Sequence, residues 1–334
     1  MRVLGIESTA HTFGVGIVEE GEPGRCRVLA NQRRMHVPAS GGIHPRVAAD
    51  HHAEVAASTL DAALTEAKST ASEIDAIAYS EGPGLGPCLR TGATAARTLA
   101  ARLGRPLVGV NHCVSHLEIG RGTTDARDPL LLYTSGGNTQ VIAYARGRYR
   151  VFGETLDVGI GNALDKFARE QGMPFPGGPK VEALARGGSR LLDLPYTVKG
   201  MDVAFSGVTT AAQALVARGE RLEDVCFSLQ ETAFAAVTEV AERALAQTGK
   251  REILMGGGVA CNERLALMVR TMAEARGARF HRPEKSLLVD NGAMIAWNGL
   301  LALAAGLRTP LGSSTVNQRY RTDQVEAAWR NGTH

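Results

Sequence analysis

Apolar and polar positions alternate along the chain in an order that occurs twice. Residues 3–18, VLGIESTAHTFGVGIV, form two apolar runs around a polar loop of small residues, and residues 130–145, LLLYTSGGNTQVIAYA, repeat this arrangement. A short turn and a third apolar run (RCRVLA, RYRVFG) follow each pair. Short apolar runs bounded by turn residues are typical of strands. The pattern therefore predicts three strands at the start of each half.

A second unit also recurs. Residues 73–110 and residues 251–282 each combine an apolar run, a glycine-rich loop, a run of Ala, Leu and Arg at helical spacing, and a further apolar run. Long helical patterns at residues 45–67 and 226–247 lie between the two units of each half. Strands followed by strand–loop–helix–strand predict layered α/β domains, in which the strand ends present the loops.

This duplication predicts two domains. A chain of 334 residues is long enough for two α/β domains. We expect the first at residues 1–112, with residues 296–334 packing back on it, and the second at residues 113–295. Ligands usually bind in the cleft between two such domains.

Composition narrows the class of protein. A net charge of +3 permits a nucleic-acid partner without indicating one. Five cysteines without a CxxC pair argue against a disulfide framework and for a reducing compartment. The apolar stretch at 291–307 carries Asn and Gly, which favours a buried helix over a membrane span. No secretory leader is visible, so we expect a cytoplasmic protein with no membrane partner.

The stretch NHCVSHLE at residues 111–118 carries two histidines four positions apart. On a helix, His112 and His116 would share one face with about 5–6 Å between their Cβ atoms, so both imidazoles could reach one metal ion. Two histidines on a half-buried face without a metal would have the same spacing. The spacing alone leaves both interpretations open.

Glycine-rich loops are candidate nucleotide contacts. SGGNTQ at 135–140 lies between two predicted strands, and GGGVACN at 256–262 joins a strand to a helix, so both could present backbone amides to a phosphate. DVGIGNALDKFAR places Asp165 where a carboxylate could bind ribose, and PGGPKVEALA places Gly178 and Glu182 one helical turn apart. A hairpin turn and surface salt bridges would explain each feature separately. Together the features favour a nucleotide site.

In combination the motifs resemble the tRNA N6-adenosine threonylcarbamoyltransferase family, and within it the archaeal–eukaryotic branch that provides the catalytic subunit of the KEOPS complex. The resemblance runs in order from Gly5 to Arg330, through GIESTAHT, SEGPGLGPCLRTGATAARTLA, PLVGVNHCVSHLE, YTSGGNTQ, LDVGIGNALDKFAR, GGPKVEALA, FSGV, GGGVACNERL, DNGAMIAW and VNQRYRTDQVEAAWR. SGGNT and STAHT place the chain outside the bacterial branch. The resemblance implies an actin-like ATPase fold of two duplicated RNase H-like α/β domains, which agrees with the duplication above.

The resemblance also implies roles for individual residues. It implies a metal held by His112, His116, Tyr133 and Asp290, and catalytic roles for His112, His116 and Glu7, the last at the acidic position that orients water or metal in actin-like ATPases. It implies substrate or nucleotide contacts from Tyr133, Thr134, Ser135, Gly136, Gly137, Asn138, Asp165, Gly178, Glu182 and Asn262. Imidazole, carboxylate and phenolate ligands suit iron or zinc better than magnesium, and we expect iron first.

The implied reaction transfers the threonylcarbamoyl group of L-threonylcarbamoyl-adenylate to N6 of adenosine 37 in tRNAs that read ANN codons, with release of AMP. The implied partners are tRNA, a small protein-kinase-like ATPase, a dimerising subunit, the other KEOPS subunits, and a separate synthase that makes the adenylate. ATP or the adenylate, with or without magnesium, is the implied nucleotide ligand.

Three other functions compete with this one. A metallopeptidase of the HExxH type would need a glutamate where Cys113 stands. A small-molecule kinase of the same superfamily uses magnesium and has no need of a paired-histidine site. A nucleotide-regulated scaffold would carry the same loops, and the sequence does not separate it from an enzyme.

One motif, HPRVAADHHAEVA at residues 44–56, has no assigned role. Its Arg46, His51 and His52 either reach the cleft or face solvent. For His52 we expect solvent.

Overall fold

Two compact units make up the computed structural model, which describes residues 1–38 and 41–330. The predicted division placed residues 113–125, 145–149 and 283–295 in the second domain, whereas the structure groups them with the first unit. The helix that follows residue 111 packs against the helix that follows residue 291, and this contact holds residues 113–125 and 283–295 in unit 1. Unit 1 comprises Met1–Asp125, Ala145–Tyr149 and Pro283–His334, and unit 2 comprises Ala126–Tyr144 and Arg150–Arg282.

Unit 1 is built on a five-stranded sheet in the order β3-β2-β1-β4-β5. The first three strands are antiparallel neighbours, while β1, β4 and β5 run parallel to one another. Because parallel strands end at the same edge of a sheet, Glu7 at the end of β1 and Asn111 at the end of β5 share that edge. The strands are β1 (Arg2–Glu7), β2 (Thr12–Glu20), β3 (Cys26–Met35), β4 (Ala76–Gly82) and β5 (Leu107–Asn111).

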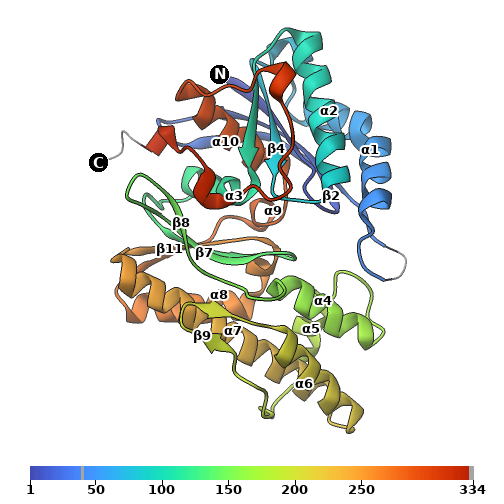
Figure 1. Ribbon diagram of the computed structural model, residues 1–334, viewed down its shortest axis with the longest axis vertical. Helices are drawn as coiled ribbons and strands as arrows, with labels where there is room; N and C mark the ends of the chain where they lie inside the picture. Colours follow the sequence, from blue (N-terminus) through green and yellow to red (C-terminus); the bar gives the residue numbers. More distant parts are fainter. Residues whose placement is uncertain (39–40, 331–334) are drawn as a thin grey trace. The chain divides into compact units, whose positions relative to one another are not determined.

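Alternate residues of these strands face two separate apolar cores, as the pleat of a strand requires. Leu4 and Ile6 of β1 face α1 and α2, which lie side by side in Figure 1. Val3 of β1 faces α10, which carries the buried Trp297. Each fully buried side chain of this kind stabilises the fold by about 1.5–3 kcal/mol. The helices of unit 1 are α1 (Pro45–Glu66), α2 (Gly86–Leu103), α3 (His112–Thr123), α9 (Lys285–Leu288) and α10 (Gly292–Ala304).

Glycines bring α10 into backbone contact with the sheet. A Cβ atom at Gly16 would lie 2.1 Å from the backbone nitrogen of Ala293, and one at Gly5 would lie 2.2 Å from that of Ala296. No side chain fits at either position without displacing the helix. The close approach therefore fixes the start of α10, and with it the residues that precede α10, against β1 and β2.

Unit 2 repeats the strand order of unit 1. Its five-stranded sheet runs β12-β11-β6-β7-β8, so in both units the first strand along the chain lies between the second and the fourth. As in unit 1, the first two strands are antiparallel and the first, fourth and fifth are parallel. This topology confirms the predicted duplication. The strands are β6 (Leu130–Thr134), β7 (Thr139–Ala145), β8 (Arg148–Glu154), β11 (Glu252–Gly256) and β12 (Arg279–His281).

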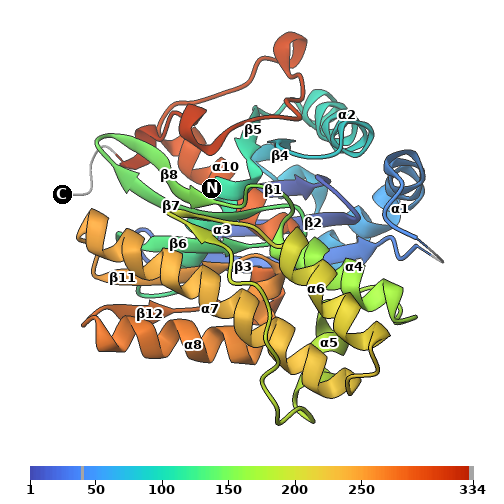
Figure 2. The ribbon, with the colours of Figure 1, turned by 60° about the horizontal axis from the view of Figure 1, so that its bottom comes forward.

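The longest helix, α7, packs against α8, and the two lie side by side in Figure 2. The helices of unit 2 are α4 (Ile160–Glu170), α5 (Gly178–Ala185), α6 (Ser206–Ala217), α7 (Leu222–Thr248) and α8 (Glu263–Ala275), and a short antiparallel pair consists of β9 (Val198–Lys199) and β10 (Asp202–Val203). Single 3-10 turns lie at Ala71–Glu73, Gly258–Cys261, Leu311–Ser313, Thr322–Gln324 and Ala328–Arg330.

The three long helical patterns are confirmed as α1, α7 and α10, although α7 begins four residues before the predicted 226, at Leu222. The stretch predicted to be a buried helix is buried along most of α10. Within the described part of the chain, no helix is both long enough and apolar enough to cross a membrane.

Candidate metal site and nucleotide-binding loops

Helix α3 begins directly at the end of β5 and presents two histidines, four residues apart, on one face. Asn111 caps it, and its side chain accepts a hydrogen bond from the backbone N–H of Val114 at 3.1 Å. The same side chain donates to the carbonyl of Tyr320 at 3.0 Å, which ties the start of α3 to the C-terminal segment. His112 is therefore the first residue of the helix, and His116 follows one turn later.

Asp290 comes to the same place from the other end of the chain. It precedes Asn291, which caps α10 by accepting a hydrogen bond from the N–H of Met294 at 3.0 Å. Because α10 lies on the sheet at glycine contact distance, Asp290 is held at the edge where β1 and β5 end. The predicted pairing of these histidines with this carboxylate is a feature of the structure.

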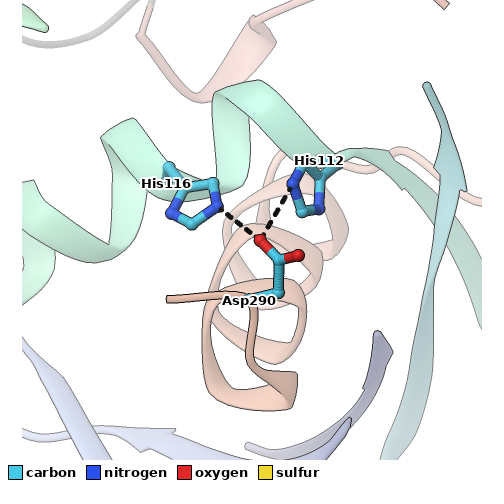
Figure 3. A group of neighbouring side chains, drawn as sticks. All are labelled: His112, His116 and Asp290. Atoms are coloured by element: carbon cyan, nitrogen blue, oxygen red, sulfur yellow. Dashed lines mark ion pairs between the residues drawn. The ribbon is translucent and has the colours of Figure 1, made fainter. Parts of the chain in front are cut away.

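The three side chains converge on one point (Figure 3). Nε2 of His112 and Nε2 of His116 each lie 3.4 Å from Oδ1 of Asp290. The two imidazole rings are nearly perpendicular, at 85°, with 4.9 Å between their centroids. One ligand atom from each residue lies within 4.8 Å of the others, and residues 1–38 and 41–330 hold no other such group of His, Cys, Asp or Glu. The arrangement can hold one metal ion.

Burial and mutual proximity set the charge of this group. Burial lowers the pKa of His116 below its usual 6.5, which favours the neutral ring with a lone pair for a metal. Burial acts to raise the pKa of Asp290, but the neighbouring His112 and His116 outweigh it and hold that pKa well below 3.8. Two imidazole nitrogens and one carboxylate oxygen form a mixed donor set that suits zinc or iron. The residues therefore fit the metal that the resemblance implies.

A second layer orients His112. The carboxylate of Glu7, which is fully buried, lies 2.9 Å from Nδ1 of His112. Its other oxygen accepts hydrogen bonds from the backbone N–H and the hydroxyl of Thr9, at 2.6 and 2.5 Å. A carboxylate that accepts from Nδ1 leaves Nε2 available for a metal and fixes the ring orientation. Glu7 is thus placed to support a metal ligand. Thr9 in turn holds the carboxylate of Glu7, and no sequence pattern had marked it for this role.

Tyr133, the remaining predicted ligand, lies at the end of β6 in unit 2 and is 1% exposed. Its predicted role at the metal stays a prediction.

The predicted nucleotide loops of unit 2 gather at one place. Ser135–Asn138 forms a tight turn closed by a hydrogen bond of 2.8 Å from the Ser135 N–H to the Asn138 carbonyl. The start of α4 lies on this turn, because the N–H groups of Gly161 and Asn162 donate to the Ser135 and Gly136 carbonyls. A Cβ atom at Gly137 would meet nothing within 4 Å, so this face of the turn is open. Such a turn can accept a phosphate.

Two carboxylates hold the neighbouring loops in place. Oδ1 of Asp165 accepts hydrogen bonds from the N–H groups of Gly177 and Gly178, at 2.7 and 3.2 Å. Oε1 of Glu182 accepts from the N–H of Glu263 at 3.1 Å, which joins α5 to the start of α8. The open space around Gly178 lies next to these contacts. The structure therefore brings Asp165, Gly178 and Glu182 into one supporting framework.

Asn262 caps α8 and is 7% exposed. Its Oδ1 accepts hydrogen bonds from the N–H groups of Arg264 and Leu265, at 2.9 and 3.1 Å, and its Nδ2 donates to Oε1 of Gln230 at 3.0 Å. Thr134, the last residue of β6, is buried and follows Tyr133 into the turn. Gln230 had no motif to mark it, since it is one of several polar residues in the SLQET stretch of α7.

The expectation that His52 faces solvent is wrong. His52 is fully buried, and its ring lies 5.5 Å from that of Phe13, centroid to centroid. It falls on the inner face of α1, which packs on the sheet, whereas Arg46 is exposed and His51 is half-buried.

Comparison with known proteins supports a single family. A family model described as tRNA N6-adenosine threonylcarbamoyltransferase matches residues 25–297. A Methanosarcina mazei protein named "Probable bifunctional tRNA threonylcarbamoyladenosine biosynthesis protein" is 56% identical over 330 residues, which cover 98% of this chain and 59% of that protein. A Thermococcus sibiricus protein named "tRNA N6-adenosine threonylcarbamoyltransferase" is 54% identical over 330 residues, 98% of this chain and 100% of that protein. The chain thus spans less than two thirds of the bifunctional relatives.

Solved structures share the fold at low identity. HypF from T. kodakarensis superposes with a TM-score of 0.66 at 15% identity, over 91% of this chain and 48% of that one. An activator of 2-hydroxyisocaproyl-CoA dehydratase from Clostridium difficile gives 0.53 at 10% identity, over 93% of this chain and 99% of that one. With the duplicated strand order, these likenesses confirm the predicted actin-like α/β fold.

Proposed function

Because the chain belongs to the tRNA N6-adenosine threonylcarbamoyltransferase family, we propose that it transfers the threonylcarbamoyl group of L-threonylcarbamoyl-adenylate to N6 of adenosine 37 in tRNAs that read ANN codons. The full-length match to the Thermococcus sibiricus protein of that name supports the proposal most directly. The amine forms a bond to the carbamoyl carbon, the bond from that carbon to the adenylate phosphate breaks, AMP leaves, and the amine loses one proton.

The metal belongs to this proposal. His112, His116 and Asp290 would hold it, with Tyr133 as a further ligand, and iron is the first candidate and zinc the second. When bound, such an ion supplies Lewis-acid polarisation of an oxygen of the adenylate. Glu7 holds the proton on Nδ1 of His112 and so keeps Nε2 in the form that can bind an ion.

The loops of unit 2 would bind the nucleotide portion of the adenylate. The turn at Ser135–Asn138 would accept the phosphate, while Asp165, Gly178, Glu182 and Asn262 would surround the nucleoside. ATP, with or without magnesium, is the alternative occupant of the same loops. Positioning of the carbamoyl carbon against the tRNA amine would supply much of the rate, since the reaction needs no protein nucleophile.

The proposed partners follow from the family resemblance. They are tRNA, a small protein-kinase-like ATPase, a dimerising subunit and the other subunits of a KEOPS assembly, with a separate synthase that supplies the adenylate. Several relatives are longer than this chain and are named bifunctional, which agrees with a partner domain fused to them. A cytoplasmic location would suit these partners.

Mass-spectrometric detection of threonylcarbamoyl-adenosine tests the proposal. The reaction would contain the purified chain, partner subunits, threonylcarbamoyl-adenylate and unmodified ANN-decoding tRNA, beside a His112→Ala/His116→Ala variant. We expect modified tRNA with the wild type and none with the folded variant. No product from either, with partners and iron or zinc present, would overturn the transferase assignment. A full rate from folded, metal-free wild type would exclude a catalytic role for the ion.

A further inference from the structure

Gln230 lies beside the proposed nucleotide loops but has no role in the function described above. It belongs to α7 and is 4% exposed, between the buried Leu229 and the buried Ala233 and Phe234. A polar side chain is costly to bury without hydrogen-bond partners. The one hydrogen bond of its side chain among the described residues is the one that Oε1 accepts from Nδ2 of Asn262, at 3.0 Å.

The backbone fixes which way the Asn262 amide points. Because backbone N–H groups only donate, the side-chain atom that receives those of Arg264 and Leu265 must be the oxygen. Both lone pairs of Oδ1 are thereby used, and Nδ2 faces Gln230. Asn262 can therefore offer a ligand only its remaining N–H.

The orientation of Gln230 follows from that of Asn262. The atom that accepts from Nδ2 of Asn262 must be Oε1, so Nε2 is the atom of the Gln230 amide that this pair leaves unpaired. Nε2 makes no hydrogen bond within the described part of the chain and is not sealed from solvent. Unpaired N–H groups thus remain on Nδ2 of Asn262 and on Nε2 of Gln230, whereas Oε1 of Gln230 is already engaged by Asn262.

The start of α8 is too firmly held for this pair to reorient. The next residue of α7, Glu231, makes a two-point ion pair with Arg264, with distances of 2.7 and 2.6 Å. From the other side, Glu182 of α5 accepts the N–H of Glu263. The donors are therefore fixed in advance, which is the condition for selecting a ligand by its hydrogen-bonding groups.

We propose that Gln230 is a specificity-determining residue of the nucleotide site. Together with Asn262 it offers unpaired N–H donors that select an acceptor atom of the nucleoside, either a ribose oxygen or a ring nitrogen of adenine. This inference rests on the proposed function, because it assumes that the loops around Asn262 bind an adenine nucleotide.

Substitution of Gln230 by side chains of similar size tests whether its N–H donor contributes to nucleotide binding. Gln230→Glu keeps an oxygen for Asn262 but replaces the unpaired donor with a carboxylate oxygen, so we expect ADP and AMP to bind about tenfold more weakly or worse by calorimetry. Gln230→Met removes both groups without adding charge, and it should lose a similar factor. Gln247→Glu is the matched control, because it makes the same change at an exposed position of the same helix and should leave affinity unchanged.

Nucleotide analogues distinguish recognition from a merely structural role. The 2′-deoxy, 3′-deoxy, 3-deaza and 7-deaza forms of ADP each remove one acceptor. We expect one analogue to bind the wild type more weakly than ADP does, and to bind Gln230→Met as tightly as ADP does. The inference would be wrong if each analogue lost the same factor of affinity with the wild type and with Gln230→Met. It would also be wrong if Gln230→Glu and Gln230→Met bound ADP with an affinity within twofold of the wild type. In both cases nucleotide binding by these loops would remain supported. If the wild type bound no adenine nucleotide, the nucleotide part of the proposed function would fail first.

Discussion

Glu7 lies 2.9 Å from Nδ1 of His112, and the same ring places Nε2 3.4 Å from Asp290. The two ring nitrogens thus have different tasks, one towards a buried carboxylate and one towards a metal site. A histidine ligand of this kind depends on its outer partner for ring orientation and basicity.

Replacing that partner should weaken metal binding without removing a ligand. In Glu7→Gln the side-chain amide no longer offers a carboxylate to His112, so we expect metal affinity to fall about 10- to 100-fold. Competition with a chromogenic chelator would measure the change with zinc. Glu20→Gln, an exposed change at the end of β2, is the control. Wild-type affinity in Glu7→Gln would show that the contact with His112 does not support the ligand.

The buried His52 should make stability depend on pH. Burial, with a smaller effect of the neighbouring His51, lowers its pKa from 6.5 to about 4. Between pH 6.5 and 4, His52 of the unfolded chain binds a proton, whereas His52 of the folded chain stays neutral. The contribution of His52 to the free energy of unfolding is therefore fully present above pH 6.5 and is lost as the pH falls towards 4. One pKa unit corresponds to about 1.4 kcal/mol, so this residue should remove about 2 kcal/mol between pH 7.5 and 5.

Urea unfolding at the two pH values would measure this loss. Between pH 7.5 and 5 the free energy of unfolding of His52→Gln should fall by about 2 kcal/mol less than that of the wild type. This difference does not depend on the stability of the variant at pH 7.5. His44→Gln, at an exposed position just before α1, should behave as the wild type does. The same pH dependence in His52→Gln and wild type would mean that His52 already takes up a proton in the folded state.

The sequence predicted those parts of the site that lie close together along the chain. The spacing of His112 and His116 and the glycine turn at Ser135–Asn138 are local patterns, and the structure has them as α3 and a tight turn. Asp290 was placed only by resemblance, because nothing local joins it to a helix so distant in the chain. Thr9 and Gln230 could not be predicted, since their roles depend on which neighbour each side chain meets after folding.

His52 shows how a local reading fails. In HPRVAADHHAEVA the adjacent His51 and His52 are both polar, and nothing in the pattern tells which of them turns inward. Neighbouring residues on a helix point about 100° apart, so the two rings cannot face the same way, and it is His52 that lies on the face of α1 that packs on the sheet. The direction is set by the whole apolar face of α1, on which Ala48, Ala49 and Ala63 are buried with His52.

Native-state thiol labelling should report on the nucleotide loops. Burial raises the pKa of Cys88 and Cys113 to about 11 and that of Cys26 and Cys226 to about 12, so their thiolates are scarce near pH 8. Cys261 is half-buried at the end of the GGGVACN loop, beside Asn262. We expect one fast-reacting thiol per chain, which is absent in Cys261→Ser.

Bound ADP should slow this reaction, because the nucleotide would cover the loop. The rate with an aromatic disulfide reagent, with and without saturating ADP, measures the protection, and unfolded protein gives the total of five thiols. Equal rates with and without ADP, under conditions in which calorimetry shows binding, would place the nucleotide away from Cys261.

The contact between α10 and the sheet should tolerate no side chain at Gly16. Its Cβ atom would meet the Ala293 nitrogen at 2.1 Å, and backbone cannot move aside as a flexible side chain can. We expect Gly16→Ala to lower the free energy of unfolding by about 3 kcal/mol, the upper end for overpacking. Because this contact also places Asp290, metal affinity should fall in the same variant. Gly312→Ala, in the same unit with nothing within 4 Å of its Cβ position, should change neither quantity. A loss of stability with undiminished metal affinity would show that Asp290 is positioned independently of the helix that follows it.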